Sequence, residues 1–316
     1  MRLPQNITES LTEKISNERL HYPCSVLIGD NSSGKSFLIK RLIEQWMPQR
    51  PVYFIDAVNR GFDVGKVTAV KENVSYANSK VVETRLKEDY FNLQDSFNCY
   101  GTSTERIEQI YSAFEEQVQQ LFAELTQKRF KIIYGDPLGE VQFEGERGTL
   151  SSGYQALIRI LLELIYYNEL SKHGDQTQKP YVVIDEVDEF LSPRYAAKIL
   201  GFLRSHFSHM EFIVSTHSID LVVAARDANI VVLYQNEYEV LDANDYNAYS
   251  EVQLIFERVF GSGEVDFTQV EKEFRRLLNN KINHAWSDAD DDRMKELGEQ
   301  DLSASQQLIY RQILKW

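Results

Sequence analysis

Residues 29–36 have the types and the spacing of a loop that binds phosphate groups. They read Gly-Asp-Asn-Ser-Ser-Gly-Lys-Ser and match the pattern G-x-x-x-x-G-K-[S/T] without a mismatch, between an apolar run and a helical pattern. Glycines let the backbone wrap closely around an anion, and the amides that follow crown the start of the next helix, where the helix dipole favours negative charge. We therefore expect Lys35 to reach the β- and γ-phosphates of a nucleoside triphosphate and the Ser36 hydroxyl to bind Mg²⁺. A glycine turn followed by a chance Lys-Ser pair is the alternative. The residues predicted to bind the nucleotide here are Gly29, Asn31, Ser32, Ser33, Gly34, Lys35, Ser36 and Phe37.

Two adjacent carboxylates, Asp185 and Glu186, directly follow the apolar run 181–184. A carboxylate after a buried strand emerges at the carboxyl edge of the sheet, where α/β folds bind ligands. We expect Asp185 to hold Mg²⁺ through water and Glu186 to polarise an attacking water as a general base. The alternative is that the acidic run 185–189 is only a solvated helix cap.

A histidine, His217, follows the apolar run 211–215 through Thr216 and would reach the same edge. It could form a hydrogen bond with the γ-phosphate or with the attacking water. A lone histidine at a strand end is usually structural, but the order of loop, acidic pair and Ser-Thr-His favours a functional role. Lys35, Glu186 and His217 are therefore the predicted catalytic residues.

Residues 150–155 read Leu-Ser-Ser-Gly-Tyr-Gln and precede a strongly helical pattern. A serine and a glycine at a helix start leave amides and a hydroxyl available, which would make a second position for an anion. The predicted anion contacts are Ser151, Ser152 and Gly153. An ordinary serine N-cap is the alternative, because many helices have one.

Short apolar runs and helical patterns alternate along the chain and predict the elements that must carry these residues. Because strands alternate with helices, we expect an α/β fold with a mostly parallel sheet and helical cover. The expected strands are residues 24–28, 52–56, 181–184, 211–215 and 230–233, the expected helices include 104–128, 155–170 and 195–207, and residues 131–134 and 140–143 are expected to form a hairpin.

The composition excludes several classes of protein. The 316 residues carry a formal net charge of −14, which disfavours a protein that coats nucleic acid nonspecifically. Two cysteines outside any CxxC pair do not form a disulfide framework. The most apolar stretch, residues 157–167, contains Arg159 and Glu163 and is shorter than the roughly 20 residues that cross a bilayer. The first residues also lack an apolar signal core. We expect a cytoplasmic protein without a membrane association.

Taken in this order, the four patterns resemble those of the ABC-type ATPases over residues 27–218. Residues 188–193, Asp-Glu-Phe-Leu-Ser-Pro, are similar to the loop of the RecF, SMC and OLD branch more than to that of transporters. The resemblance implies a P-loop NTPase fold with an antiparallel N-terminal β portion and a short helical lobe over about 86–128. It also implies an ATPase domain over 1–235, with the signature helix starting at 151, and a mainly helical extension over 236–316.

The resemblance also implies a mechanism. Members hydrolyse ATP with Mg²⁺ and enclose two ATP molecules in a head-to-tail homodimer, so residues 150–155 would act on the partner's nucleotide. The family's lid glutamine, a further Mg²⁺ ligand, is assigned to Gln94. Ser152 and Tyr154 depart from the residues that transporter members favour.

The spacing between the motifs and the family resemblance together reduce the number of functions that we expect. Ser151 lies 116 positions after Lys35, which leaves no room for a long coiled-coil arm, and the 99 residues after His217 are too few for a Toprim-like nuclease. Related stand-alone ATPases are often bacterial and act with an effector protein from the same operon in anti-phage defence. A RecF-type ATPase that binds DNA, and an ATP-gated scaffold with slow hydrolysis, are the alternatives; the loop over 188–193 argues against a transporter subunit.

Two further features allow two interpretations each. Arg60 follows the strand 52–56 and either contacts the nucleotide or, as we favour, lies in a surface turn. Residues 287–292, Ser-Asp-Ala-Asp-Asp-Asp, lack the glycine and terminal glutamate of a calcium loop and are interpreted as a flexible acidic linker.

Overall fold

A computed structural model describes most of the chain. It covers residues 4–314 except 18, 32, 48–49, 57–59, 68–81, 84–85, 88–105, 135–139, 173–178, 235–236, 247, 261–272, 275, 278–279, 282–285, 299, 301, 303–309 and 311–312. Residue contacts divide the chain into two units, Met1–Phe260 and Gly261–Trp316. The division falls after Phe260, beyond the boundary at 235 expected from the sequence.

The first unit is built on a six-stranded sheet in the order β2-β6-β7-β1-β8-β9. All neighbouring strands pair in parallel except β8 and β9. Every side chain of β1, β2, β6 and β8 is buried, which is why these strands appear in the sequence as continuous apolar runs. The mostly parallel α/β fold is confirmed. The strands are β1 (Ser25–Gly29), β2 (Val52–Ile55), β6 (Tyr181–Ile184), β7 (Glu211–Thr216), β8 (Asn229–Leu233) and β9 (Tyr238–Asp242).

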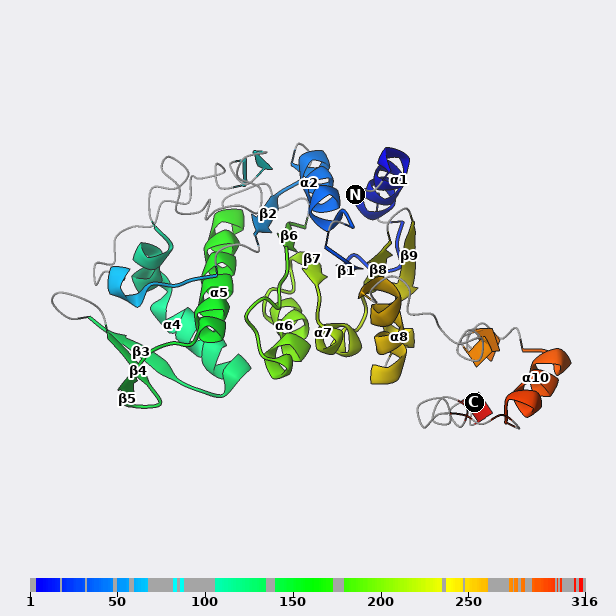
Figure 1. Cartoon of the computed structure of the whole chain (residues 1–316). Helices are drawn as coiled ribbons and strands as arrows, with labels where there is room; N and C mark the ends of the chain where they lie inside the picture. The colour runs from blue at the N-terminus through cyan, green and yellow to red at the C-terminus, as the bar shows by residue number, and fades with distance from the viewer. Residues whose placement is uncertain are drawn as a thin grey trace. The chain divides into compact units, whose positions relative to one another are not determined.

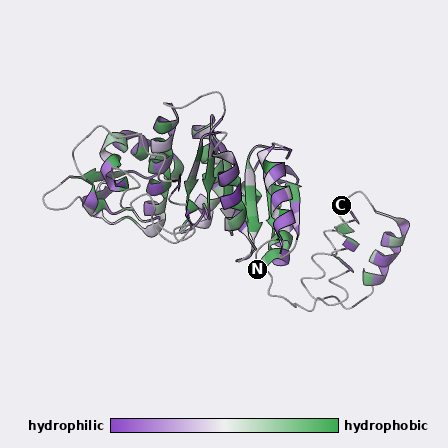
Figure 2. Cartoon of the chain, turned by 90° about the horizontal axis from the view of Figure 1, so that it is seen from above, coloured by the Kyte–Doolittle hydropathy of each residue, from purple (hydrophilic) through white to green (hydrophobic). Residues whose placement is uncertain are grey.

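Helices cover both faces of this sheet (Figure 1). One face carries α1 (Gln5–Ser16) and α2 (Lys35–Trp46), and the other carries α6 (Pro193–His206), α7 (Ile219–Ala224) and α8 (Tyr249–Phe260). In Figure 2 the strands are mainly hydrophobic, whereas the helices carry hydrophobic and hydrophilic residues together. This is the pattern of helices that bury one face against a core. Two short 3₁₀ helices, η1 (Val64–Lys66) and η2 (Ala243–Asp245), complete the connections.

A lobe beside β2 contains two long helices and a small antiparallel sheet (Figure 1). The helices are α4 (Ile107–Thr126) and α5 (Ser152–Lys172), and the sheet has the order β3-β4-β5. The expected hairpin is confirmed: β3 (Phe130–Ile133) pairs antiparallel with β4 (Glu140–Phe143), and β4 pairs with β5 (Glu146–Gly148). Among the described residues, the strands with antiparallel pairing are therefore β3–β5 and the pair β8–β9, whereas the described N-terminal residues form α1.

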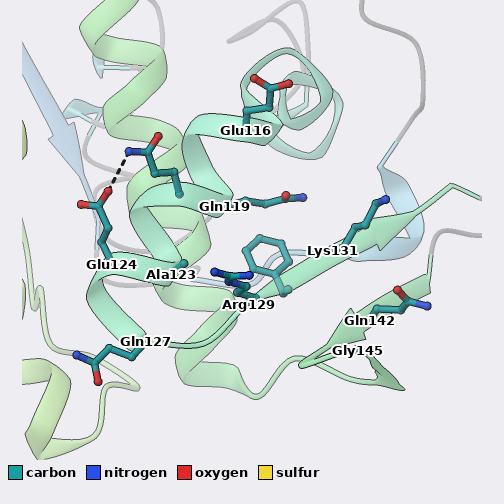
Figure 3. Close-up of a pocket in the computed structure, with 11 residues that line it drawn as sticks. Glu116, Gln119, Ala123, Glu124, Gln127, Arg129, Lys131, Gln142 and Gly145 are labelled. Atoms are coloured by element: carbon teal, nitrogen blue, oxygen red, sulfur yellow. Dashed lines mark hydrogen bonds between the residues drawn. The ribbon is translucent and has the colours of Figure 1, made fainter.

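A pocket of about 820 Å³ opens in this lobe between α4 and the β3–β4 hairpin (Figure 3). Amide and charged side chains line most of it, among them Gln119, Arg129 and Lys131. Gln120 donates a hydrogen bond of 2.9 Å to Glu124 at its rim. The pocket belongs to the lobe and not to the carboxyl edge of the six-stranded sheet.

The second unit has a small core of its own, and its described residues include the helix α10 (Asp288–Gly298). The prediction of a flexible linker over 287–292 is wrong, because these residues start α10. Asp290 accepts hydrogen bonds of 3.0 and 2.9 Å from the backbone and hydroxyl of Ser287, and its carboxylate pairs with Arg276 at 2.8 Å. Acidic side chains in the first turn also favour a helix, because they face the positive end of its dipole. The core residues are Phe274, Leu277, Met294, Leu297, Leu302 and Ile313.

Within the described parts of the chain, no helix is both long enough and apolar enough to cross a membrane.

Candidate nucleotide-binding site

The phosphate loop connects the end of β1 to the start of α2, as the sequence pattern requires. Gly34 adopts a left-handed conformation with φ of 102°, and α2 begins at the next residue. A side chain at Gly29 would clash with Ser33, because an added Cβ would lie 2.3 Å from its hydroxyl. Both glycines are therefore needed for the shape of this loop. Asn31 is exposed, Phe37 is half-buried, and Ser32 lies outside the described residues.

Lys35 extends its side chain into the loop. Its ammonium donates hydrogen bonds to the carbonyl oxygens of Gly29 at 2.6 Å and Asp30 at 3.2 Å. Burial lowers the pKa of Lys35, and the negative charges of Asp185, Glu186 and Asp30 act in the opposite direction. A cation held in this position, with the amides at the start of α2, is the arrangement that binds phosphate groups.

Three neighbouring strands bring the other predicted residues to the same edge. The strands β6, β7 and β1 are neighbours and parallel, so their carboxyl ends lie at the same edge of the sheet. That edge therefore carries Asp185 after β6, His217 after β7 and the phosphate loop after β1. The Ser36 hydroxyl donates a hydrogen bond of 3.1 Å to Asp185 Oδ2. The sheet thus joins residues that lie about 150 positions apart in the sequence.

Glu186 lies beside His217 at the mouth of the site. The distance from His217 Nε2 to Glu186 Oε1 is 3.5 Å, and both side chains are about one-third exposed. The hydrogen bond from His217 lowers the pKa of Glu186; burial opposes this effect, and the charges of Lys35 and Arg60 reinforce it. Glu186 also has a positive φ of 49°, a conformation that is uncommon away from glycine and that occurs at functional sites. The Glu186 carboxylate is thus partly exposed and lies within reach of the His217 imidazole.

The oxygens of Ser36 and Asp185 fit a Mg²⁺ ion. Mg²⁺ prefers oxygen ligands and is commonly held by one or two protein groups together with substrate phosphates. Among the described residues there is no cluster of three or more His, Cys, Asp or Glu side chains that would bind a metal without a nucleotide. Gln94, the predicted third ligand, lies outside the described residues.

Two curated proteins are similar in sequence to parts of this chain. The Septu protein PtuA of Bacillus mycoides (strain KBAB4) is 23% identical over 269 residues, which cover 68% of this chain and 37% of that protein. The Septu protein PtuA of Bacillus thuringiensis is 30% identical over 117 residues, which cover 35% of this chain and 28% of that protein. The chain therefore spans about a third of the length of these curated relatives. No family model matches the chain.

Among solved structures, an SMC head domain from Thermotoga maritima has a TM-score of 0.31 and 22% identity, covering 43% of this chain and 50% of that one. An ATP-binding cassette of an ABC transporter in its ADP conformation has a TM-score of 0.38 and 17% identity, covering 76% and 87%. These similarities are low, so the strand order, the motif order and the site geometry of the chain itself carry the assignment. The chain has a mostly parallel α/β fold, and its motifs follow the order that resembles the ABC-type ATPases.

The predicted signature residues lie at the start of α5, whereas the phosphate loop connects β1 to α2. Ser151 and Ser152 are exposed, and α5 begins at Ser152. The Ser151 hydroxyl accepts a long hydrogen bond of 3.4 Å from the backbone amide of Tyr154, as a helix cap does. Across the described part of the chain, no hydrogen bond joins Ser151, Ser152 or Gly153 to the phosphate loop.

Two site residues were not in the predicted set. Ser215 is completely buried, and its hydroxyl donates a hydrogen bond to Asp185 Oδ1 and accepts one of 2.7 Å from the Glu186 amide. Its place at the end of a strand, two residues before His217, was the signal for it. Arg60 is 2% exposed, so its interpretation as a surface turn is wrong; it donates a hydrogen bond of 2.7 Å to the carbonyl oxygen of Asp185. The sequence around Arg60 gives no sign of this contact.

Proposed function

We propose that this chain is an ABC-type ATPase, which binds ATP with Mg²⁺ and hydrolyses it to ADP and phosphate. The observation that carries the proposal is that five side chains meet at one edge of the sheet, at the start of α2 and directly after β6 and β7: Lys35, Ser36, Asp185, Glu186 and His217. Each side chain there matches a requirement of phosphoryl transfer: a cation for the phosphates, oxygens for the metal, and a base for the water.

In this proposal, Lys35 and the amides at the start of α2 hold the β- and γ-phosphates. Ser36 and Asp185 would hold Mg²⁺, which when bound neutralises charge on the phosphates. Glu186 takes a proton from a water molecule as the water oxygen bonds to the γ-phosphorus and the bond to the β–γ bridging oxygen breaks. His217, 3.5 Å from Glu186, donates a hydrogen bond to the γ-phosphate.

The proposal extends to a head-to-tail homodimer that encloses two ATP molecules. Its support is that Ser151 and Ser152 are exposed at the start of α5. Such a position suits a γ-phosphate held by a second copy. Each ATP would then bridge two chains, so ATP would stabilise the dimer and hydrolysis would release it.

We further propose that the dimer gates a partner effector protein in bacterial anti-phage defence. The similarity to two Septu PtuA proteins supports this role. Co-purification of the product of a neighbouring gene with the ATP-bound dimer tests it. Retardation of duplex DNA by the same dimer, with a steep salt dependence, would favour a DNA-binding ATPase instead.

The decisive experiment on the enzyme compares Glu186→Gln with Lys35→Ala. Glu186→Gln removes the base and is expected to lower the hydrolysis rate by about 10²- to 10⁴-fold while ATP binding persists, so ATP-bound dimers accumulate in light scattering. Lys35→Ala is expected to weaken ATP binding by about 10-fold or more, because a charge-assisted hydrogen bond is lost.

Glu189→Gln is the matched control, since Glu189 belongs to the same acidic run and lies three residues beyond Glu186. It should leave hydrolysis close to that of the unaltered protein. Hydrolysis that survives Glu186→Gln would refute the assignment of the base. ATP binding that is unchanged by Lys35→Ala would refute the nucleotide site itself. A protein that binds ATP and dimerises without turnover would be an ATP-gated scaffold.

A further inference from the structure

Residues 60–62 connect the helix that carries the signature residues to the strand that carries the carboxylates. Arg60 donates a hydrogen bond of 2.7 Å to the carbonyl oxygen of Asp185. The next two residues bond to α5: Arg159 donates to the carbonyl oxygen of Gly61 at 3.4 Å, and the Phe62 amide donates to Gln155 Oε1 at 3.4 Å. Three consecutive residues thus link α5 to the end of β6.

The α5 side of this link is fixed by buried charges. Arg159 and Glu163 form an ion pair at 2.9 Å, and each side chain is 1% exposed. The Glu163 carboxylate also accepts a hydrogen bond of 2.8 Å from the hydroxyl of Tyr53 on β2. A buried ion pair contributes little net stability, because removing two charges from water is costly. What the pair supplies here is a fixed geometry for Arg159 and, through it, for Gly61.

The other end of the link reaches both carboxylates. Asp185 binds Arg60 through its backbone carbonyl, and Glu186 is the next residue, with its unusual positive φ. The start of α5 also touches the loop beyond Glu186: a Cβ added to Gly153 would lie 2.7 Å from the carbonyl oxygen of Phe190. Phe190 is 51% exposed and has a positive φ of 65°. The signature helix therefore contacts the segment with the carboxylates on two sides.

We propose that residues 60–62 are a strap through which α5 sets the position of Asp185 and Glu186, with Arg60 as the positioning residue. This inference rests on the proposed ATPase function. It implies that a shift of α5, when Ser151 and Gly153 meet the nucleotide of a second copy, moves the carboxylates of the same chain. The two ATP sites of a dimer are then coupled through buried polar contacts within each subunit.

The test separates catalysis from nucleotide binding. Arg60→Met removes the bond to Asp185 while keeping much of the side-chain volume. It is expected to lower kcat on the order of 10²-fold, the cost of misplacing a catalytic group by about 1 Å, with the Kd for ATP changed by less than about threefold. Arg60→Lys keeps the charge and one donor and should restore part of kcat. The Hill coefficient for ATP should fall towards 1 in Arg60→Met.

Two variants on α5 probe the same strap from its other end. The double variant Arg159→Leu/Glu163→Leu removes the ion pair without leaving one charge buried alone, and Gln155→Leu removes the acceptor for the Phe62 amide. Both variants are expected to lower kcat and the Hill coefficient. The Kd for ATP should change little in either variant. The control is Glu169→Gln/Lys172→Met, which removes the more exposed ion pair of 2.5 Å at the far end of α5 and should change neither.

A wild-type kcat and Hill coefficient in folded Arg60→Met would overturn the strap. If Arg60→Met does not fold, Gln155→Leu is the test of the strap. An unchanged kcat and Hill coefficient in Gln155→Leu would then overturn the strap. Equal losses of kcat and ATP affinity would show general damage to the site and would also count against the strap. Failure of the proposed function looks different, because the unaltered protein would then bind no ATP or would bind it independently of Lys35.

Discussion

Ser215 contacts both acidic residues of the site, the side chain of Asp185 and the backbone of Glu186. Its hydroxyl donates to the Asp185 carboxylate and accepts from the Glu186 amide, so one buried group fixes the side chain of the first and the backbone of the second. Glu186 keeps its positive φ in this setting. At the scale of single residues, the site depends on such supporting contacts as much as on the groups that would touch ATP.

Ser215→Ala tests this support. The substitution leaves the Glu186 amide without its acceptor and removes a donor from Asp185, so unfolding should need about 1–3 kcal/mol less free energy. Hydrolysis should fall as well, because Glu186 loses its fixed position. Urea denaturation and steady-state turnover measure the two effects. Ser205→Ala, at an exposed serine on α6, is the control and should change neither; a Ser215→Ala protein as stable as the parent would contradict the proposed support.

Element α10 shows how an acidic stretch becomes ordered. Asp290 is 1% exposed although it lies in a run of four acidic residues over 288–292. Burial alone would raise its pKa, but hydrogen bonds from Ser287, Asn280 and Arg276 lower the pKa below its ordinary value near 3.8. The carboxylate is therefore more acidic in the folded second unit than in the unfolded chain.

This difference predicts a loss of stability in acid. A carboxyl with a lowered folded pKa stabilises the fold above its unfolded pKa, and that contribution is lost as the pH falls from about 4 through the folded value. The second unit should therefore unfold more readily as the pH drops below about 4. Asp290→Asn should weaken this dependence and lower the stability at pH 7, as followed by Trp286 fluorescence. Asp288→Asn, in the same turn, is the control; equal pH profiles for Asp290→Asn and the parent would contradict the role of Asp290.

At the scale of the whole molecule, the boundary between the two units determines which fragment of the chain should fold by itself. β9 pairs with β8 along its full length, and α8 lies against α7. The ring of Phe260, the last residue of the first unit, packs 5.2 Å from the ring of His217. Residues 236–260 therefore belong to the core that carries the candidate site.

Truncation tests this division. A chain ending at Phe260 should keep its cooperative thermal transition within about 3 °C and should still bind ATP, because no part of its core is removed. A chain ending at residue 235 loses β9 and α8, exposes the β8 edge, and should lose the cooperative transition. Calorimetry and ATP titration of both fragments provide the measurement. A stable, ATP-binding fragment of residues 1–235 would place the boundary where the sequence suggested.

The sequence by itself determined the fold class and the order of the predicted site residues. Buried parallel strands are continuous apolar runs, and a phosphate loop needs glycines at fixed spacing, so both kinds of information are local. The hairpin β3–β4 and the helix α4 were predicted for the same reason.

Tertiary structure decided the contacts between residues far apart in the chain. Three contacts join segments with no shared local pattern: Arg60 with Asp185, Arg159 with Gly61, and Arg276 with Asp290. A charged side chain has the same sequence signal in a solvated turn as in a buried hydrogen bond. Only the packing of the elements around it supplies the partner that makes burial favourable.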